Sequence, residues 1–284
     1  MKQRFPGIFF SFVLVILYLF FQAYLGFLGA LIGSTGLMIL VSISISALAV
    51  MIIASKVNRE PLEQAVAWGA LNLKALLPIL TMTVSLAILL SELDNLVATY
   101  LIDPARYEDL LWQITRLFPK DSPVDLALVV ASVAIIGPAM EEGVFRGVIY
   151  RGVASHHGIR FGIVFTAVVF MVIHLNPIQF PATLILGLIY AWMISAGYRT
   201  SDTFIAHALH NSISIPFLLE LAEVPGMSAA PADELAHVPA GVLAGAGAIF
   251  LASIFLVKKL APERGGDDEK GDTIPSHEAH EPRG

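Results

Sequence analysis

Two adjacent acidic residues, Glu141 and Glu142, stand inside the apolar stretch 126–150, and Arg146 follows the second of them by four residues. An ionisable side chain in hydrocarbon is costly, so its presence there marks a candidate functional site. At helical spacing Glu142 and Arg146 share one face, with the acid in the favourable N-terminal position for an ion pair. We therefore expect Arg146 to neutralise Glu142, and Glu141 to face a polar cavity. The alternative is that both glutamates form one structural network with Arg146.

Two further apolar stretches carry histidines. His174 ends the run that begins at Phe170, whereas His207 and Asn211 stand four residues apart and therefore lie one above the other on a helical face. At about 1.5 Å of rise per residue, Glu141, His174 and His207 each fall about 10–20 Å from one end of their helices. Three separate helices are thus expected to carry ionisable groups near the middle of the membrane.

Other histidines are expected away from this group. His210 is rotated by about 100° from Asn211 around the helix, so it should face another helix. His156 and His157 lie in a predicted cytoplasmic loop, and His277 and His280 lie near the C-terminus, where a solvated surface is the simpler interpretation.

These side chains could hydrolyse a peptide bond without a covalent nucleophile. Such a reaction needs a general base for water, donors for the tetrahedral oxyanion and an acid for the leaving amine. A carboxylate beside an imidazole can supply the base, and His207 with Asn211 can supply the donors. Glu141 or His174 could then return the proton to the amine.

A zinc site is the first alternative, because Glu141, His174 and His207 make a set of two histidines and one carboxylate that leaves a position for water. The chain has no H-E-x-x-H motif, and these ligands would come from three helices. The absence of cysteine excludes thiolate zinc sites, disulfides and a cysteine nucleophile. We therefore expect no cofactor, with zinc as the alternative.

A transporter or ion channel is the second alternative, because buried acids and histidines also line ion pathways. Transporters often contain internal repeats or paired broken helices, and the two halves of this chain show no convincing repeat. A scaffold that keeps the site residues without catalysis is a third possibility.

The composition predicts an all-α membrane protein that positions these residues in a bundle with a central polar cavity. Hydrophobic residues make up 56% of the 284 residues, charged residues make up 14%, and the mean hydropathy is +0.76. A spanning helix needs about 20 mainly apolar residues. Eight stretches are candidates: 8–28, 37–54, 76–90, 126–150, 161–174, 181–196, 203–221 and 238–257.

The basic residues predict an orientation, because Lys and Arg near helix ends accumulate on the cytoplasmic side. With eight spans and the N-terminus inside, fourteen of the seventeen basic residues are cytoplasmic. We therefore expect a multi-pass integral membrane protein with both termini in the cytoplasm. The first apolar stretch is expected to be an anchor, since it is longer than a signal-peptide core and no cleavage motif follows it.

Two segments lie outside the predicted spans. The stretch 107–118 is amphipathic at helical spacing, which predicts either an interfacial helix on the outer leaflet or a short helix packed on the mouth of the bundle. The end of the chain carries seven acidic and three basic residues after Pro262. We expect a helical membrane domain over 1–261 and a disordered acidic tail over 262–284, which argues against binding to nucleic acid or anionic lipid.

Small residues and prolines indicate how the helices pack. Gly187, Ala191 and Ser195 are spaced by four, as are Gly241 and Gly245, which would let helices approach closely in lipid. Two prolines, Pro138 and Pro216, are expected to kink their helices and to free backbone carbonyls.

The order of three motifs resembles the type II CAAX prenyl protease and bacteriocin-processing family (CPBP) of intramembrane proteases. The motifs are Glu141-Glu142-x-x-x-Arg146, Phe170-x-x-x-His174 and His207-x-x-x-Asn211, and the resemblance covers about 138–212.

The resemblance implies an intramembrane endopeptidase in which Glu141 and His174 activate water, while His207 and Asn211 stabilise the oxyanion. Glu142 and Arg146 would support this site. The implied partners are the lipid bilayer and a membrane-anchored protein or lipidated peptide as substrate. Eukaryotic members of the family remove three residues after a prenylated cysteine, whereas many bacterial relatives have no known prenylated target.

Overall fold

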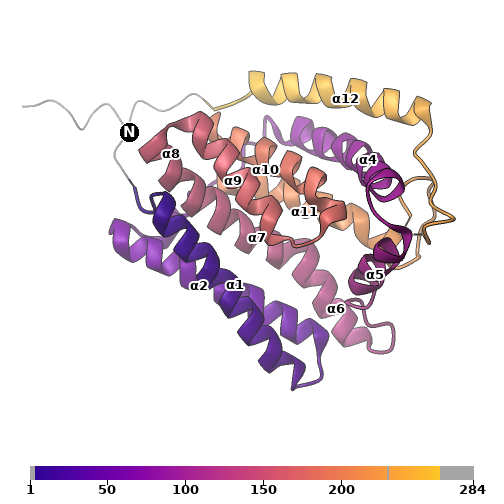
Figure 1. Cartoon of the computed structure of the whole chain (residues 1–284). Coiled ribbons are helices and arrows are strands. Elements are labelled where there is room, and N and C mark those ends of the chain that lie inside the picture. Colours follow the sequence, from indigo (N-terminus) through magenta and orange to yellow (C-terminus); the bar gives the residue numbers. More distant parts are fainter. Residues whose placement is uncertain (1–3, 229, 263–284) are drawn as a thin grey trace, which may run out of the picture.

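The computed structural model describes residues 4–228 and 230–262, and in that part of the chain the regular elements are all helical (Figure 1). The helices are α1 Ile8–Ala30, α2 Thr35–Asn58, α3 Leu62–Ala65, α4 Leu76–Tyr100, α5 Pro104–Thr115, α6 Pro123–Ala131, η1 Ser132–Ile136, α7 Gly137–Glu142, η2 Gly143–Tyr150, α8 Arg151–His157, α9 Ile159–Ile173, η3 Pro177–Gln179, α10 Phe180–Ser195, α11 Thr200–Leu218 and α12 Ala240–Lys259. The all-helical fold class is thus confirmed, while the predicted acidic tail beyond Pro262 lies outside the described residues.

The number of spans differs from the predicted eight. Helices occupy all eight predicted stretches, but within the described residues six are long and apolar enough to cross a membrane. The other two are α9 and α11. At 1.5 Å per residue, the 15 residues of α9 reach about 22 Å, which is less than the hydrocarbon core of about 30 Å. The third predicted span was too short, because α4 continues past residue 90 to Tyr100.

Local capping explains where several helices begin. Ser34 accepts a hydrogen bond from the backbone N–H of Leu37 at the start of α2, and Ser122 accepts one from Asp125 at the start of α6. Asp103 caps α5 in the same way, with Pro104 in the first turn, where a missing N–H costs nothing. These polar residues separate apolar stretches that would otherwise be continuous.

The glutamate pair lies in one 35-residue helix that runs from Pro123 to His157. This helix is α-helical over α6, α7 and α8, but it widens to π-helical geometry over Ser132–Ile136 and Gly143–Tyr150. Wide turns of this kind are rare and occur often at functional sites. The two π-helical segments flank α7, which ends at Glu142.

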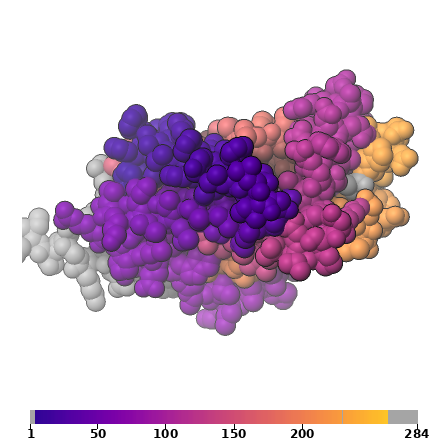
Figure 2. Space-filling model, turned by 90° about the horizontal axis from the view of Figure 1, so that it is seen from below, coloured from indigo at the N-terminus to yellow at the C-terminus, as the bar shows by residue number. Residues whose placement is uncertain are grey.

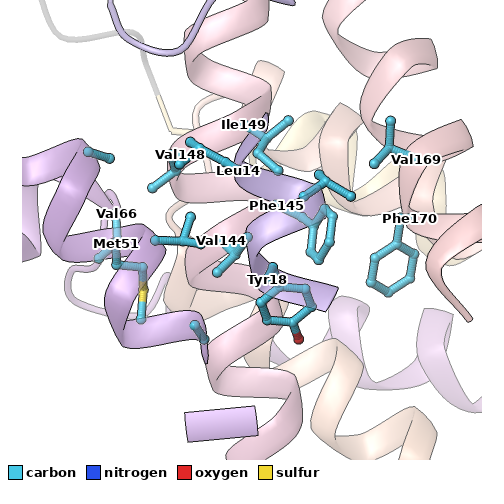
Figure 3. Packing of buried hydrophobic residues seen from close by; sticks show 14 of the residues in the cluster. Leu14, Tyr18, Met51, Val66, Val144, Phe145, Val148, Ile149, Val169 and Phe170 are labelled. Carbon is cyan, nitrogen blue, oxygen red and sulfur yellow. The ribbon is translucent and has the colours of Figure 1, made fainter. Parts of the chain in front are cut away.

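The second π-helical segment is held by apolar packing (Figure 3). All eight of its residues are buried, and Val144, Phe145, Val148 and Ile149 contact side chains of α1, α2 and α9. Gly147 lets this segment approach the chain after α3, because a Cβ there would lie 2.5 Å from the carbonyl oxygen of Val66. The helix that carries the glutamates is therefore fixed on several sides.

Of the two sets of small residues predicted to let helices approach closely, the one that contains Gly187 lies at a helix contact and the pair Gly241 and Gly245 does not. Gly187 lies against α9, where an added Cβ would be 2.8 Å from the Cα of Ala167. In contrast, Gly241 and Gly245 have no atom within 4 Å of an added Cβ, so they face open space. Spacing alone did not show which side of α12 would be covered.

The N-terminal helices expose a strongly apolar face (Figure 2 shows the side that α1 and α2 form). On α1, Phe9 is 72% exposed, Ile16 is 65% exposed and Phe27 is 65% exposed. A patch of this size is unusual on a soluble monomer and fits contact with lipid. The six apolar helices and this surface make the chain an integral, multi-pass membrane protein.

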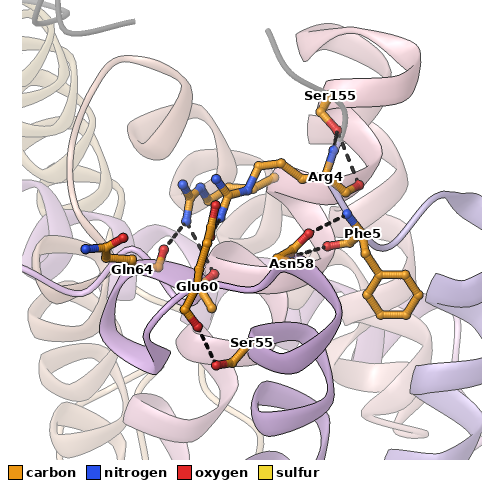
Figure 4. Close-up of polar contacts among 9 residues, drawn as sticks. Arg4, Phe5, Ser55, Asn58, Glu60, Gln64 and Ser155 are labelled. Carbon is orange, nitrogen blue, oxygen red and sulfur yellow. Dashed lines mark hydrogen bonds and ion pairs between the residues drawn. The ribbon is translucent and has the colours of Figure 1, made fainter. Parts of the chain in front are cut away.

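One end of the bundle collects the segments that were predicted to be cytoplasmic (Figure 4). Arg4 forms an ion pair with Glu60 after α2, and its backbone N–H donates to Ser155 of α8 at 2.8 Å. Asn58 exchanges two hydrogen bonds with the backbone of Phe5. These contacts place the N-terminus, the α2–α3 connection and α8 together on one side of the bundle.

The amphipathic stretch 107–118 forms most of α5, and its apolar side packs on the bundle. Tyr107 and Leu110 are buried against Ala98 and Ile178, which are contributed by α4 and η3. Trp112, on the other side of the helix, is 60% exposed. Of the two predicted arrangements, the structure shows the helix that packs on the mouth of the bundle.

Candidate functional site

Glu142 is the central residue of the candidate site. Its side chain is fully buried, and its Oε1 atom lies 3.2 Å from Nη1 of Arg146, which is also fully buried. The same oxygen lies 2.9 Å from Nδ1 of His207 on α11. The predicted i,i+4 ion pair is therefore present, and it extends to a histidine 65 residues further along the chain.

The guanidinium of Arg146 lies between aromatic rings. Its Cζ atom is 4.3 Å from the ring centroid of Phe170 and 5.3 Å from that of Tyr190. Its nitrogens have no hydrogen-bond partner among the described residues, so the charge is balanced by the Glu142 carboxylate and the negative faces of two rings. Tyr190 was not predicted as a site residue. In the sequence it is one aromatic residue in an apolar helix, and no spacing distinguishes it.

Glu141 lies on the other side of the same imidazole. Its Oε2 atom is 3.8 Å from Nε2 of His207, and its side chain is 19% exposed, whereas that of Glu142 is fully buried. Since an ionised carboxylate only accepts hydrogen bonds, Nδ1 of His207 donates to Glu142 and Nε2 is the nitrogen turned toward Glu141. The structure thus separates the two glutamates as expected, one buried beside Arg146 and one accessible.

His174 does not contact either glutamate by a hydrogen bond or an ion pair among the described residues. Its Nδ1 atom lies 2.7 Å from the carbonyl oxygen of Phe170, so Nδ1 donates there and Nε2 keeps its lone pair. The His174 ring packs on the phenyl ring of Phe170 with centroids 4.7 Å apart, and the His207 ring packs on it at 5.8 Å. Both imidazoles therefore contact one phenyl ring.

Asn211 connects α11 to the first π-helical segment. Its Nδ2 atom donates to the carbonyl oxygen of Val133 at 2.9 Å. The Val133 carbonyl lacks a donor within its own helix. The backbone N–H of Gly137 donates to the carbonyl oxygen of Ser132 instead, and Pro138, the next residue that could donate, has no N–H. Pro138 thus leaves the Val133 carbonyl free, as expected from the sequence, and Asn211 is the donor that binds it. The second hydrogen of the amide is available for another acceptor.

The contact of Asn211 with Val133 leads to a testable expectation. Asn211→Ala should lower the free energy of unfolding in detergent by about 1–2 kcal/mol, since it leaves the Val133 carbonyl without a donor. In a Pro138→Ala background, Asn211→Ala should lower the free energy of unfolding by less, because the residue at position 138 then has a backbone N–H that can donate to the Val133 carbonyl. A double-mutant cycle based on thermal unfolding measures the difference, and equal losses in both backgrounds would show that Pro138 does not create the need for this bond.

The alternative zinc site would need Glu141, His174 and His207 to converge. Within the described residues, no group of three His, Cys, Asp or Glu side chains is placed so that it could hold a metal ion. One nitrogen of each histidine already contacts a protein oxygen. The arrangement therefore provides a carboxylate beside one oriented imidazole, with a second imidazole packed on the same phenyl ring of Phe170.

Comparison with known proteins gives one match. Residues 123–213 match the family described as Rce1-like, type II CAAX prenyl endopeptidase Rce1-like. This segment includes all six candidate residues: Glu141, Glu142, Arg146, His174, His207 and Asn211. No curated protein and no solved structure matches the chain. The family resemblance deduced from the three motifs is thereby confirmed.

Proposed function

We propose that this membrane protein, whose residues 123–213 match the type II CAAX prenyl endopeptidase family, is an intramembrane endopeptidase. Its substrate would be a membrane-anchored protein, cut close to its lipid anchor. The observation that carries the proposal is the accessible Glu141 carboxylate next to Nε2 of His207, whose ring is oriented by the buried Glu142.

Each site residue has a role in this proposal. Glu141 is the general base that removes a proton from water, and His174 assists it through its free Nε2. Asn211 and the Nε2–H of His207 donate to the oxyanion of the tetrahedral intermediate, and Glu141 returns the proton to the leaving amine. This role requires His207 to carry a proton on both ring nitrogens, because its Nδ1–H is already donated to Glu142. Glu142 and Arg146 are positioning residues, because they act through His207 and through the packing of the helix. The supporting geometry is the 2.9 Å contact between His207 and Glu142.

We further propose that the reaction proceeds without zinc and that both chain termini face the cytoplasm. The proposal on zinc is supported by the placement of the described His, Asp and Glu side chains, of which no three are arranged to hold a metal ion. The proposal on orientation is supported by the contacts that gather Arg4, Glu60 and Ser155 at one end of the bundle, since basic residues near spans accumulate on the cytoplasmic side.

A cleavage assay in detergent tests the proposed activity. The purified protein is incubated with a farnesylated CAAX peptide and with the same peptide lacking the lipid, and mass spectrometry identifies the products. We expect a product shortened by three residues from the farnesylated peptide, with turnover unchanged after exhaustive chelation. Cleavage of both peptides at equal rates would reject the lipidated substrate class. Loss of turnover on chelation, restored by zinc, would reject the metal-free mechanism.

A further inference from the structure

A cavity of about 200 Å³ lies next to the candidate site but is not lined by its glutamates. It is lined by α4, α5, the segment around η3 and α11, and by described residues of the connection between α11 and α12. Its polar lining includes Asp94, Asn95, Asn176 and His210. His210 stands three residues after His207 and is therefore its neighbour on the helix surface. The cavity thus meets the candidate site along α11.

Two groups in the cavity lining lack partners. The Oδ1 atom of Asp94 and the Nδ1 atom of His210 are enclosed, and neither has a hydrogen-bond partner among the described residues. Their neighbours are satisfied, since Ser91 and Asn95 both donate to the carbonyl oxygen of Gly226. Buried polar atoms in native proteins are almost always paired. The carboxyl group of Asp94 lies in the wall of the cavity with one oxygen that has no partner among the described residues.

The charge of the lining indicates the kind of ligand that would bind there. Among the described residues, Asp94 is the only acidic residue in the lining, and no Lys or Arg side chain there lines the cavity to balance it. A carboxylate removed from water is costly unless a cation accompanies it. The rest of the wall is largely apolar and includes Leu90, Leu111 and Phe217. The cavity thus combines one acidic side chain that has no basic partner in the described lining with largely apolar walls.

We propose that this cavity binds an organic ammonium group that is attached to an apolar body. The ammonium pairs with the carboxyl group of Asp94, and the first carbons of the attached chain contact the apolar wall. The volume sets the size of the bound part, because it is below the 300–1,000 Å³ typical of pockets for drug-sized ligands. A lysine side chain of a membrane peptide and the head group of an ethanolamine lipid have this chemistry. Binding requires no cleavage, so the proposal stands apart from the proposed protease activity.

Hexylamine is the probe for the first test, with hexanol as its uncharged analogue. A ligand that binds the folded state raises the unfolding temperature in a saturable manner. We expect hexylamine to stabilise the wild-type protein in detergent, and Asp94→Asn to raise the half-saturating concentration by about tenfold, as loss of a charged hydrogen bond implies. Asp109→Asn, an acid-to-amide change on the exposed side of α5, should leave it unchanged. Hexanol should affect wild-type protein and Asp94→Asn equally.

A second variant tests the cavity itself. Ser214→Trp adds a large ring at an exposed position of the lining while leaving Asp94 in place, and it should abolish saturable stabilisation by hexylamine. An undiminished response in Asp94→Asn or in Ser214→Trp would overturn the proposal. Glu141→Gln should respond as the wild type does, which separates this result from any failure of the protease assignment.

Competition identifies the natural source of the ammonium group. One arm adds an ethanolamine lipid to phosphatidylcholine vesicles that contain the protein, and the other adds an apolar peptide with a central lysine, matched by a norleucine peptide. Competition by the lipid or by the lysine peptide alone supports the corresponding source. If neither competes, hexylamine is an adventitious additive only and the proposal fails.

Discussion

Glu141→Gln is expected to reduce the turnover of a cleaved membrane peptide by about 10²–10⁴-fold, which is the usual contribution of a general base. The amide has almost the same shape as the carboxylate but cannot remove a proton from water. Because the Glu141 side chain is partly exposed and its one ion pair among the described residues, with His207, spans 3.8 Å, the change should leave the fold intact. The measurement is the steady-state rate in detergent, together with the unfolding temperature of both proteins.

Glu63→Gln provides the matched control for this experiment. It makes the same chemical change at an exposed position of α3, far along the chain from the site, so turnover should stay within about twofold, as for most surface substitutions. A Glu141→Gln protein that cleaves at the wild-type rate would contradict the role of this residue as the base. A variant that has lost activity and has also unfolded would not support that role.

Arg146→Met is expected to give the largest loss of stability, about 3–5 kcal/mol in the free energy of unfolding. The guanidinium is fully buried, and its removal leaves the Glu142 carboxylate with no cation except a protonated His207. Methionine keeps an unbranched side chain of similar length between Phe170 and Tyr190, so the loss reports the charge more than the packing. Denaturant titration of the purified protein in mixed micelles measures the effect.

The double variant Glu142→Gln/Arg146→Met is the control for this second prediction. Removing both charges eliminates the uncompensated carboxylate, so the double variant should be more stable than Arg146→Met alone. Its turnover should still be reduced, because the neutral amide no longer fixes His207 as a carboxylate does. If the double variant is less stable than Arg146→Met, the stability that Arg146→Met loses comes from packing instead of from the uncompensated charge.

The sequence was sufficient for the positions of the helices and for contacts inside one helix. Apolar stretches located all eight helices, and the spacing of Glu142 and Arg146 predicted their ion pair, because helical periodicity relates residues four apart. The accessible position of Glu141 followed from the same periodicity. The family match over residues 123–213 includes every residue that the motifs singled out.

Contacts between helices could not be predicted in the same way. The bond between His207 and Glu142 joins residues 65 positions apart, and the spacing of the motifs gives no distance between helices. The expectation that Glu141 and His174 act on the same water stays a prediction, and the bond of His174 to the Phe170 carbonyl could not be predicted from its spacing. The π-helical segments were also unexpected, because Pro138 indicates a disturbance of the helix but not its type.

The predicted count of eight spans is not confirmed, because two of the eight helices do not combine the length and the hydropathy of a typical span. Hydropathy predicts a span wherever an apolar stretch is long, but α9 is short, and α11 carries Asp202, His207, His210 and Asn211 on one helix. A helix with that many polar groups satisfies them against neighbouring helices and need not contact lipid on all sides. The two helices that do not meet the criteria for a span are α9, whose C-cap is His174, and α11, which carries His207.

The shortness of α9 has a consequence for the surrounding bilayer. Val164, Val168 and Val172 form an outward apolar stripe on this helix, with exposures of 55%, 41% and 49%. Acyl chains that contact this stripe meet a hydrophobic length of about 22 Å, so they must shorten or tilt beside it. A hydrophobic mismatch of this kind is expected to thin the bilayer next to His174.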